Sequence, residues 1–354
     1  MTKRLLCVHV GASKTGTSAL QRGLRDSQEM LRAAGIGSPF PGRHSSVRRL
    51  LWPMGWVAGS GFVRPVEPTV VDDLAAAMRN TSGERLLISN EDLCEMDPTR
   101  ISLFLRAAAA ADLDVVVVLT GRDWGKQLPS EWQQFLKHRL TVAYPAFLEQ
   151  VRHREGAAAE HFWVRQDYAG ICRRWGASLD PARVHVIPVP SMAQDPEGVF
   201  RSFGDVVGFD GTSLTRPRRA VNPSFGYVEA EVLRRLNLAL GTRLPDYEVE
   251  YAPAVRRVLV KQVLARESSG RITLPPEHLD WVRELDQQRV DDLLARGYRV
   301  HGDPKLLVTP ADSGRPLPLL DEGAIATAAV ETLANFVVRS FRDRTEGVPA
   351  DDDV

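Results

Sequence analysis

The sequence is poor in cysteine and contains no long apolar run. Its three cysteines, Cys7, Cys94 and Cys172, stand far apart and form no Cys-x-x-Cys pair. This excludes a disulfide framework and a zinc site built on paired cysteines, and it fits a reducing compartment. No stretch approaches the roughly 18 apolar residues of a membrane span. The apolar run after Lys3 and Arg4 is too short for a signal peptide, so we expect a cytoplasmic protein without a transmembrane segment.

The chain also lacks an excess of either charge. It carries 45 Lys and Arg against 45 Asp and Glu, so its formal net charge at pH 7 is zero. A balanced chain does not bind nucleic acid through its bulk charge, and we expect no nucleic-acid partner. With 354 residues, 44% of them hydrophobic, it is long enough to bury a full core as one large α/β domain or as two domains.

Short apolar runs alternate with helical stretches in the N-terminal part of the chain. Because they are almost continuously apolar, we predict buried strands at 5–10, 85–89, 114–120 and 184–188. Helices are predicted at 17–34, 98–111 and 161–175. Strands that alternate with helices build a mostly parallel sheet covered on both faces. The predicted fold class is therefore α/β, a three-layer α/β/α sandwich.

Two regions depart from this pattern. Residues 39–68 are rich in proline and glycine, with Trp52, Trp56 and Phe62 interleaved, and we interpret this segment as a lid-like loop. Beyond about residue 210 the strand signals fade, and helices are predicted at 224–237, 252–267, 276–296 and 323–344. We therefore divide the chain into an α/β core (1–230), a helical extension packed on it (231–346) and a disordered tail (347–354).

The most specific pattern follows the first predicted strand. There the chain reads Gly11-Ala12-Ser13-Lys14-Thr15-Gly16-Thr17-Ser18 and then enters a predicted helix. Free backbone N–H groups and the positive end of a helix bind anions at such a position, and glycine lets the chain curl around the ligand. A lysine and three hydroxyl groups point to the same chemistry. The simpler alternative is a strand–helix turn in which the hydroxyl groups only cap the helix.

The loop differs from the nucleotide P-loop. In the pattern G-x-x-x-x-G-K-[ST] a lysine follows the second glycine, but here Thr17 stands at that place and the lysine is Lys14. Lys-Thr-Gly-Thr-Ser instead resembles the 5′-phosphosulfate loop of sulfotransferases that use 3′-phosphoadenylyl sulfate (PAPS), Pro-Lys-x-Gly-Thr-Thr/Ser. Ser13 replaces the usual proline. The resemblance implies that the loop binds the donor's 5′-phosphosulfate through Ser13, Lys14, Thr15, Gly16, Thr17 and Ser18.

A second pair of residues resembles the 3′-phosphate site of the same family. Arg122 follows the predicted strand 114–120, and Ser130 stands eight positions later, the residue types and spacing with which sulfotransferases hold the adenosine 3′-phosphate. Ser130 and Gln133 also match a capping box. We therefore predict a helix that begins at Ser130, with its first N–H groups and the Arg122 guanidinium around one phosphate.

The resemblance covers roughly residues 5–230. Segments 129–133, 173–187 and 219–224 also look like actinobacterial members of the PAPS-dependent sulfotransferase family. It implies a fold related to P-loop nucleotide kinases, PAPS as donor, adenosine 3′,5′-bisphosphate (PAP) as product and no metal. The sulfuryl group would pass to a hydroxyl or amine of a small-molecule, lipid or glycan acceptor. The identity of the acceptor, the oligomeric state and the role of the C-terminal helices are left open.

In-line transfer needs a cation near the leaving oxygen and a base near the attacking group. Lys14 is the candidate for the first role. For the base we favour Glu91, which directly follows a predicted strand and so lies at the carboxyl edge of the sheet. Related enzymes place a Glu or His base there. Asp92 is an equally acidic neighbour, and His44 on the lid-like loop is the second candidate.

Further candidates are weaker. Asn222 and Ser224 are candidates for a nucleotide contact, and the aromatic residues of the lid-like loop for walls of an apolar acceptor pocket. Two other functions compete. An ATP-dependent kinase or NTPase with a degenerate P-loop would need Mg²⁺ and an acidic ligand at a strand end, for which Asp123 is the one candidate. A non-catalytic nucleotide-binding protein would use its helical C-terminal part as a partner surface.

Overall fold

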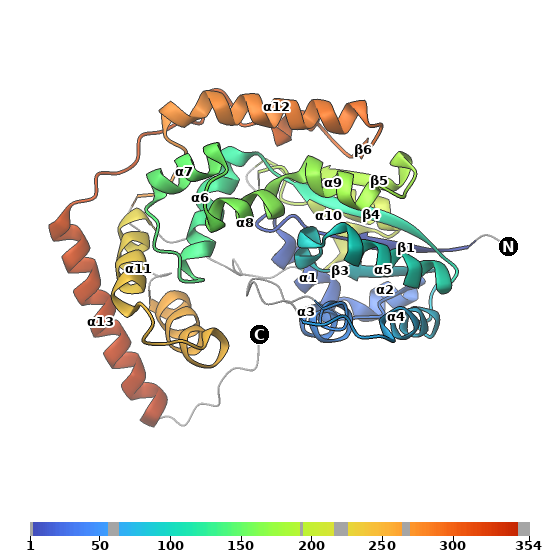
Figure 1. Ribbon diagram of the computed structural model, residues 1–354, viewed down its shortest axis with the longest axis horizontal. Coiled ribbons are helices and arrows are strands. Elements are labelled where there is room, and N and C mark those ends of the chain that lie inside the picture. The colour runs from blue at the N-terminus through green and yellow to red at the C-terminus, as the bar shows by residue number, and fades with distance from the viewer. Residues whose placement is uncertain (1–2, 56–63, 192–193, 216–225, 264–269, 346–354) are drawn as a thin grey trace. The chain divides into compact units, whose positions relative to one another are not determined.

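The computed structural model of the protein (Figure 1) describes residues 3–55, 64–191, 194–215, 226–263 and 270–345. By its contacts the chain divides into two compact units. The first consists of Met1–Trp124, His161–Arg219 and Trp281–Pro310, and the second of Gly125–Glu160, Ala220–Asp280 and Ala311–Val354.

The first unit contains a six-stranded sheet. Its strands are β1 (Arg4–His9), β2 (Ile36–Gly37), β3 (Arg85–Ser89), β4 (Leu113–Gly121), β5 (Val184–Pro188) and β6 (Arg299–Val300). They lie in the order β2-β3-β1-β4-β5-β6, and all neighbouring strands are parallel. The chain first builds the sheet on one side of β1 and then crosses to β4 on the other side. Ligands bind beyond the carboxyl ends of the strands at such a switch point, which is where the segments after β1, β3 and β4 lie.

The helices of this unit connect the strands. They are α1 (Thr17–Asp26), α2 (Gln28–Ala33), α3 (Gly42–Ser46), α4 (Val70–Arg79), α5 (Pro98–Ala110), α9 (Tyr168–Gly176), α10 (Gly198–Val207) and the larger parts of α8 (Ala157–Gln166) and α12 (Leu279–Ala295). A π-helical stretch, Val47–Leu51, follows α3 directly.

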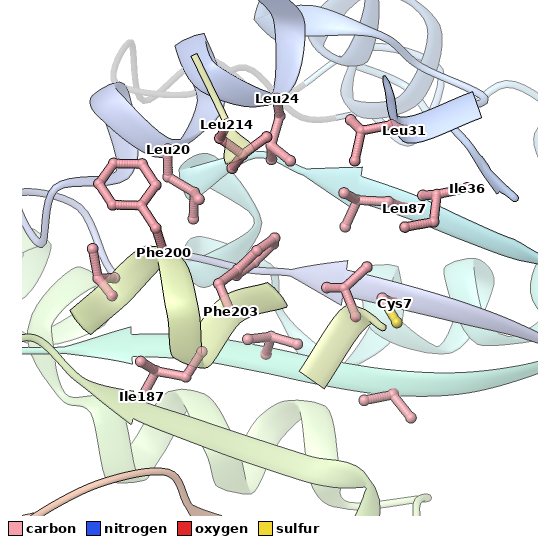
Figure 2. Packing of buried hydrophobic residues seen from close by; sticks show 14 residues of the cluster. Cys7, Leu20, Leu24, Leu31, Ile36, Leu87, Ile187, Phe200, Phe203 and Leu214 are labelled. Carbon is pink, nitrogen blue, oxygen red and sulfur yellow. The ribbon is translucent and has the colours of Figure 1, made fainter. Parts of the chain in front are cut away.

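Helices α1 and α10 cover one face of the sheet (Figure 2). Cys7, Leu87 and Ile187 of the strands pack against Leu20 of α1 and Phe203 of α10, and all of these side chains are buried. Apolar burial contributes about 25 cal/mol per Å². This packing holds α1 against the sheet and thereby fixes the position of its N-terminus, at the carboxyl edge of β1.

Helices α5 and α9 pack on β4 from the other face, and α4 packs on α5. The rings of Phe104 and Trp175 meet edge to face at 5.6 Å between α5 and α9. Asp97 begins α5 by accepting the N–H of Arg100 at 2.9 Å, with Pro98 as its first residue. Both faces of the sheet are therefore covered, which confirms the predicted three-layer α/β fold.

The second unit is helical over its described residues. Its helices are α7 (Tyr144–His153), α11 (Tyr227–Leu240), α13 (Glu322–Thr345), a π-helical segment Tyr247–Val263 and all but the first residue of α6 (Trp124–Leu136). The Asn237 amide donates to the carbonyl oxygens of Leu136 (2.8 Å) and Leu140 (3.0 Å), and Trp132 packs on Tyr144 with ring centres 5.1 Å apart. These contacts join α11 and α7 to α6.

Several predicted elements differ from those observed. The helix predicted at 17–34 breaks at Ser27 into α1 and α2, and the two-residue strands β2 and β6 were not predicted. The segment 39–68 is less irregular than expected, since it contains α3 and the π-helical stretch; Trp56, Phe62 and the tail 347–354 lie outside the described residues.

The units also divide the chain differently from the expected boundary at residue 230. Residues 281–310, with β6, belong to the first unit, whereas α6 and α7 belong to the second. Over the described ranges, the structure holds no helix that is long and apolar enough to cross a membrane.

Candidate active site

The loop between β1 and α1 leaves the start of α1 open. Gly11, Lys14 and Gly16 have positive φ angles of 108°, 61° and 84°, so the chain curls back on itself before the helix begins. Gly16 is the N-cap residue, and no side chain caps α1. The alternative that the loop hydroxyls only cap the helix is therefore wrong. The first N–H groups of α1 therefore have no side-chain cap, which is the arrangement that the predicted anion site requires.

Thr15 and Thr120 hold the base of the loop on β4. The Thr15 hydroxyl lies 2.7 Å from the carbonyl oxygen of Ala12 and 2.6 Å from the Thr120 hydroxyl. The Ala12 N–H donates to the Thr120 carbonyl oxygen (2.9 Å), and the Thr120 N–H donates to that of Gly11 (2.6 Å). Thr15 is buried, so its hydroxyl serves the structure of the loop.

Ser13 is held by a residue that the sequence analysis did not single out. The Gln166 side-chain nitrogen lies 2.8 Å from the Ser13 hydroxyl oxygen and 3.2 Å from its carbonyl oxygen. Both residues are almost completely buried. No sequence pattern could reveal this contact, because the two residues are 153 positions apart.

Lys14 stands between these two anchored residues. Its side chain is half-buried, and its ammonium group forms no ion pair with any described residue. The contacts of Ser13 and Thr15 hold the backbone on both sides of Lys14, so the position of the Lys14 backbone is fixed as well. A cation in this position is available to an anionic ligand at the start of α1.

Glu91 lies beside the same helix start. It follows β3, and the Asn90 side chain begins a short 3₁₀ turn there by accepting the N–H of Asp92 at 2.8 Å. The Thr17 hydroxyl donates to Oε2 of Glu91. The structure thus brings Glu91, predicted as a base, into contact with the first residue of α1.

The two other candidates for the base are Asp92 and His44. Asp92 is 1% exposed, and its Oδ1 lies 3.8 Å from Nη1 of Arg165, so this carboxylate is turned into the protein. His44 lies on α3, but its side chain is outside the described residues. Two residues later, the Ser46 hydroxyl accepts a hydrogen bond from the Asn90 amide at 2.8 Å, which ties α3 to the segment that carries Glu91.

His9, the last residue of β1, is a core residue. It is fully buried, with Nδ1 2.7 Å from the Ser89 hydroxyl and its ring edge to face with Phe203 at 5.3 Å. Burial lowers the pKa of His9 to about 4, because the charged imidazolium would lose its hydration. The imidazole is therefore neutral at pH 7.

The predicted helix start at Ser130 is wrong. Helix α6 begins at Trp124, two residues after Arg122, and runs through Pro129 and Ser130 to Leu136. Pro129 lies inside the helix, where it has no N–H to donate to the carbonyl oxygen of residue 125. Ser130 therefore offers a hydroxyl but no helix-start N–H groups. Arg122 belongs to the first unit and Ser130 to the second, so a shared phosphate stays a prediction.

Residues of α12 hold the chain where β4 passes into α6. The backbone N–H of Trp124 donates to Oδ2 of Asp286 at 3.2 Å, and the same oxygen accepts the Thr309 hydroxyl at 2.6 Å. The Arg289 guanidinium lies 3.4 Å from the centre of the Trp124 ring. Burial raises the pKa of Asp286 to about 7 despite the nearby Arg289. The segment that carries Arg122 is thus anchored to α12.

The structure describes only some of the remaining candidates. In the part of the chain that the structure describes, no three His, Cys, Asp or Glu side chains gather where they could hold a metal ion. Asp123 is buried. Asn222 and Ser224 lie outside the described residues. The Trp52 ring lies close to two guanidinium groups, those of Arg64 (4.4 Å from the ring centre) and Arg48 (5.8 Å).

Comparisons with known proteins add one distant likeness. No family model and no curated protein matches the chain. A solved structure, a sulfotransferase from Alicyclobacillus acidocaldarius, is similar at 19% sequence identity with a TM-score of 0.41, over 69% of this chain and 96% of the other.

Proposed function

We propose that the protein is a sulfotransferase that moves a sulfuryl group from PAPS to a hydroxyl or amine of an acceptor. The observation that carries the proposal is the uncapped start of α1, with Lys14 in the loop before it and Glu91 hydrogen-bonded to Thr17 at its first residue. An anion site, a cation and a carboxylate at one sheet edge are the groups that in-line sulfuryl transfer requires.

In this proposal the two ends of the donor bind to two parts of the chain. The backbone N–H groups at the start of α1, with the hydroxyl of Ser18, hold the 5′-phosphate, while the Thr17 hydroxyl donates to Glu91. Arg122, at the end of β4, and the hydroxyl of Ser130 hold the 3′-phosphate. Of the loop residues, Ser13 and Thr15 contribute their backbone, because their side chains are buried and hydrogen-bonded within the protein.

The chemical step needs two side chains. The oxygen of the acceptor hydroxyl forms the new bond to sulfur, and Glu91 takes the proton of that hydroxyl. The bond between sulfur and the 5′-phosphate oxygen breaks with the electron pair on that oxygen, and Lys14 stabilises the resulting charge on PAP. A carboxylate has about four lone-pair positions, so the Thr17 hydroxyl leaves room at Glu91 for the acceptor proton.

The acceptor is a small molecule, a lipid or a glycan. All three cysteines are free and buried, which supports a reducing compartment, the cytoplasm, as the place of the reaction. Incubation with PAPS carrying a radioactive sulfur and extracts of host metabolites identifies the acceptor by the label that it receives.

Titration calorimetry tests donor recognition. PAP should bind, and 5′-AMP should bind about tenfold more weakly or worse, because a charge-assisted hydrogen-bonded contact to the 3′-phosphate contributes about 1.5–3 kcal/mol. Binding of ATP with Mg²⁺ but not of PAP would instead support a kinase or NTPase.

Turnover separates an enzyme from a binding protein. Lys14→Ala should lose sulfuryl transfer, whereas Lys305→Ala, a change of an exposed lysine, should keep it. Binding of PAP with no transfer to any acceptor in the extracts would contradict the enzymatic part of the proposal.

A further inference from the structure

We propose that Gln166 is a positioning residue for the 5′-phosphate loop and acts on it through Ser13. This role rests on the proposed function and extends it, since it names a residue outside the loop on which the geometry of the anion site depends. Gln166 is the last residue of α8.

The Gln166 side chain contacts the loop at two acceptor atoms, and both residues are buried. One amide nitrogen lies 2.8 Å from the hydroxyl oxygen and 3.2 Å from the carbonyl oxygen of Ser13. Gln166 is 1% exposed and Ser13 2%, so water cannot replace the amide at these two acceptors. Removing a donor from a buried acceptor is costly, so the Gln166 amide stabilises this conformation of the loop.

Ser13 is the position at which such a constraint matters most. On its far side, Lys14 has a left-handed backbone, and Thr15 is already tied to β4 through Thr120. The Gln166 amide anchors the residue directly before Lys14, as Thr120 anchors the residue directly after it. The Gln166 side chain therefore completes the fixation of the segment that carries the lysine and leads to the helix start.

Gln166 also contacts the second phosphate-binding segment, but through its main chain. Its carbonyl oxygen accepts the indole N–H of Trp124 at 2.9 Å, and Trp124 follows Arg122 by two residues. A change of the side chain removes the bond to Ser13 and keeps the bond to Trp124. The side-chain variant should therefore affect 5′-phosphate binding selectively.

The test compares Gln166→Met with the wild-type protein in binding three nucleotides: PAP, 5′-AMP and 3′-AMP. Methionine matches glutamine in length and has no donor. The affinities for PAP and 5′-AMP should fall about tenfold, and that for 3′-AMP should change less than about twofold. In turnover, kcat should fall together with donor affinity, because Lys14 is no longer held in place.

Two further variants separate this role from general stabilisation. Ser13→Ala removes only the hydroxyl acceptor and should give a smaller loss with the same selectivity; combined with Gln166→Met, it should add nothing, because both changes break one interaction. Asn237→Leu is the matched control. It removes another buried amide that donates to two carbonyl oxygens, in the second unit, and should leave the ratio of 5′-AMP to 3′-AMP affinity unchanged.

The outcomes are distinct. An unchanged ratio of the 5′-AMP and 3′-AMP affinities in Gln166→Met overturns the positioning role while the proposed function stands. If Gln166→Met does not fold, Ser13→Ala decides by the same ratio. Wild-type protein that binds none of the three nucleotides overturns the proposed function and this role with it.

Discussion

Replacing Glu91 by glutamine separates proton removal from donor binding. The amide has the shape of the carboxylate, and its carbonyl oxygen can still accept the Thr17 hydroxyl that the Glu91 Oε2 now accepts. The amide cannot take up the acceptor proton at neutral pH. We therefore expect Glu91→Gln to bind PAP and to transfer sulfuryl groups very slowly.

The size of each effect follows from the contacts. General-base catalysis contributes about 10²–10⁴ in rate, which corresponds to about 2.7–5.4 kcal/mol of activation free energy. The Thr17 hydrogen bond loses its charge assistance but is not broken, which costs about 1 kcal/mol. The rate should therefore fall by about two decades or more, and the affinity for PAP by less than about tenfold.

The assay measures PAP release at saturating donor and acceptor, beside titration calorimetry with PAP. Asp92→Asn is the matched control. It changes the adjacent carboxylate, which is buried near Arg165, and should lower the melting temperature but not the turnover of the folded protein. A rate near that of the wild type in Glu91→Gln would refute Glu91 as the base and move the role to His44.

Three further predictions follow from the same structure. Lys14→Ala should lower kcat about a hundredfold or more at saturating donor, because a cation facing the leaving oxygen acts mainly in the transition state; an unchanged kcat would contradict its role. Arg122→Ala should weaken PAP binding about tenfold or more and leave 5′-AMP unaffected, and an equal loss for both nucleotides would show that Arg122 does not hold the 3′-phosphate. Burial lowers the pKa values of His9 and of His185 to about 4 in the folded protein, so both are neutral there while the unfolded chain protonates them below about pH 6.5. The unfolded state then binds more protons than the folded state. The contribution of these two histidines to the free energy of unfolding is therefore complete above about pH 6.5 and should be lost as the pH falls towards 4. Urea unfolding midpoints that stay constant between pH 7 and pH 5 would contradict this.

The fold was largely predictable because its central strands are buried on both faces. β1, β3, β4 and β5 appear in the sequence as short, almost continuous apolar runs, as strands between two helical layers must. The edge strands Ile36–Gly37 and Arg299–Val300 are two residues long and leave no such pattern. Because β6 could not be predicted from the sequence, residues 281–310 were assigned to the helical extension, whereas they belong to the first unit.

The residues of the candidate site that directly follow a strand could be predicted from the sequence, and those brought in from distant parts of the chain could not. The Lys14 loop directly follows β1 and Glu91 directly follows β3, so their residue types and positions were readable from one short stretch each. The helix start was misplaced at Ser130, because a capping pattern and a proline look the same inside a helix as at its beginning. Gln166 and Asp286 reach the site from distant parts of the chain through buried contacts, and such contacts leave no spacing to recognise.

A crystal structure of the protein grown with PAP tests the central claim most directly. We predict electron density for one phosphate at the backbone N–H groups of Thr17 and Ser18, beside Lys14, and for the other within hydrogen-bond distance of the Arg122 guanidinium. Density for PAP elsewhere, or for a nucleotide whose 3′-phosphate faces solvent away from Arg122, would contradict it.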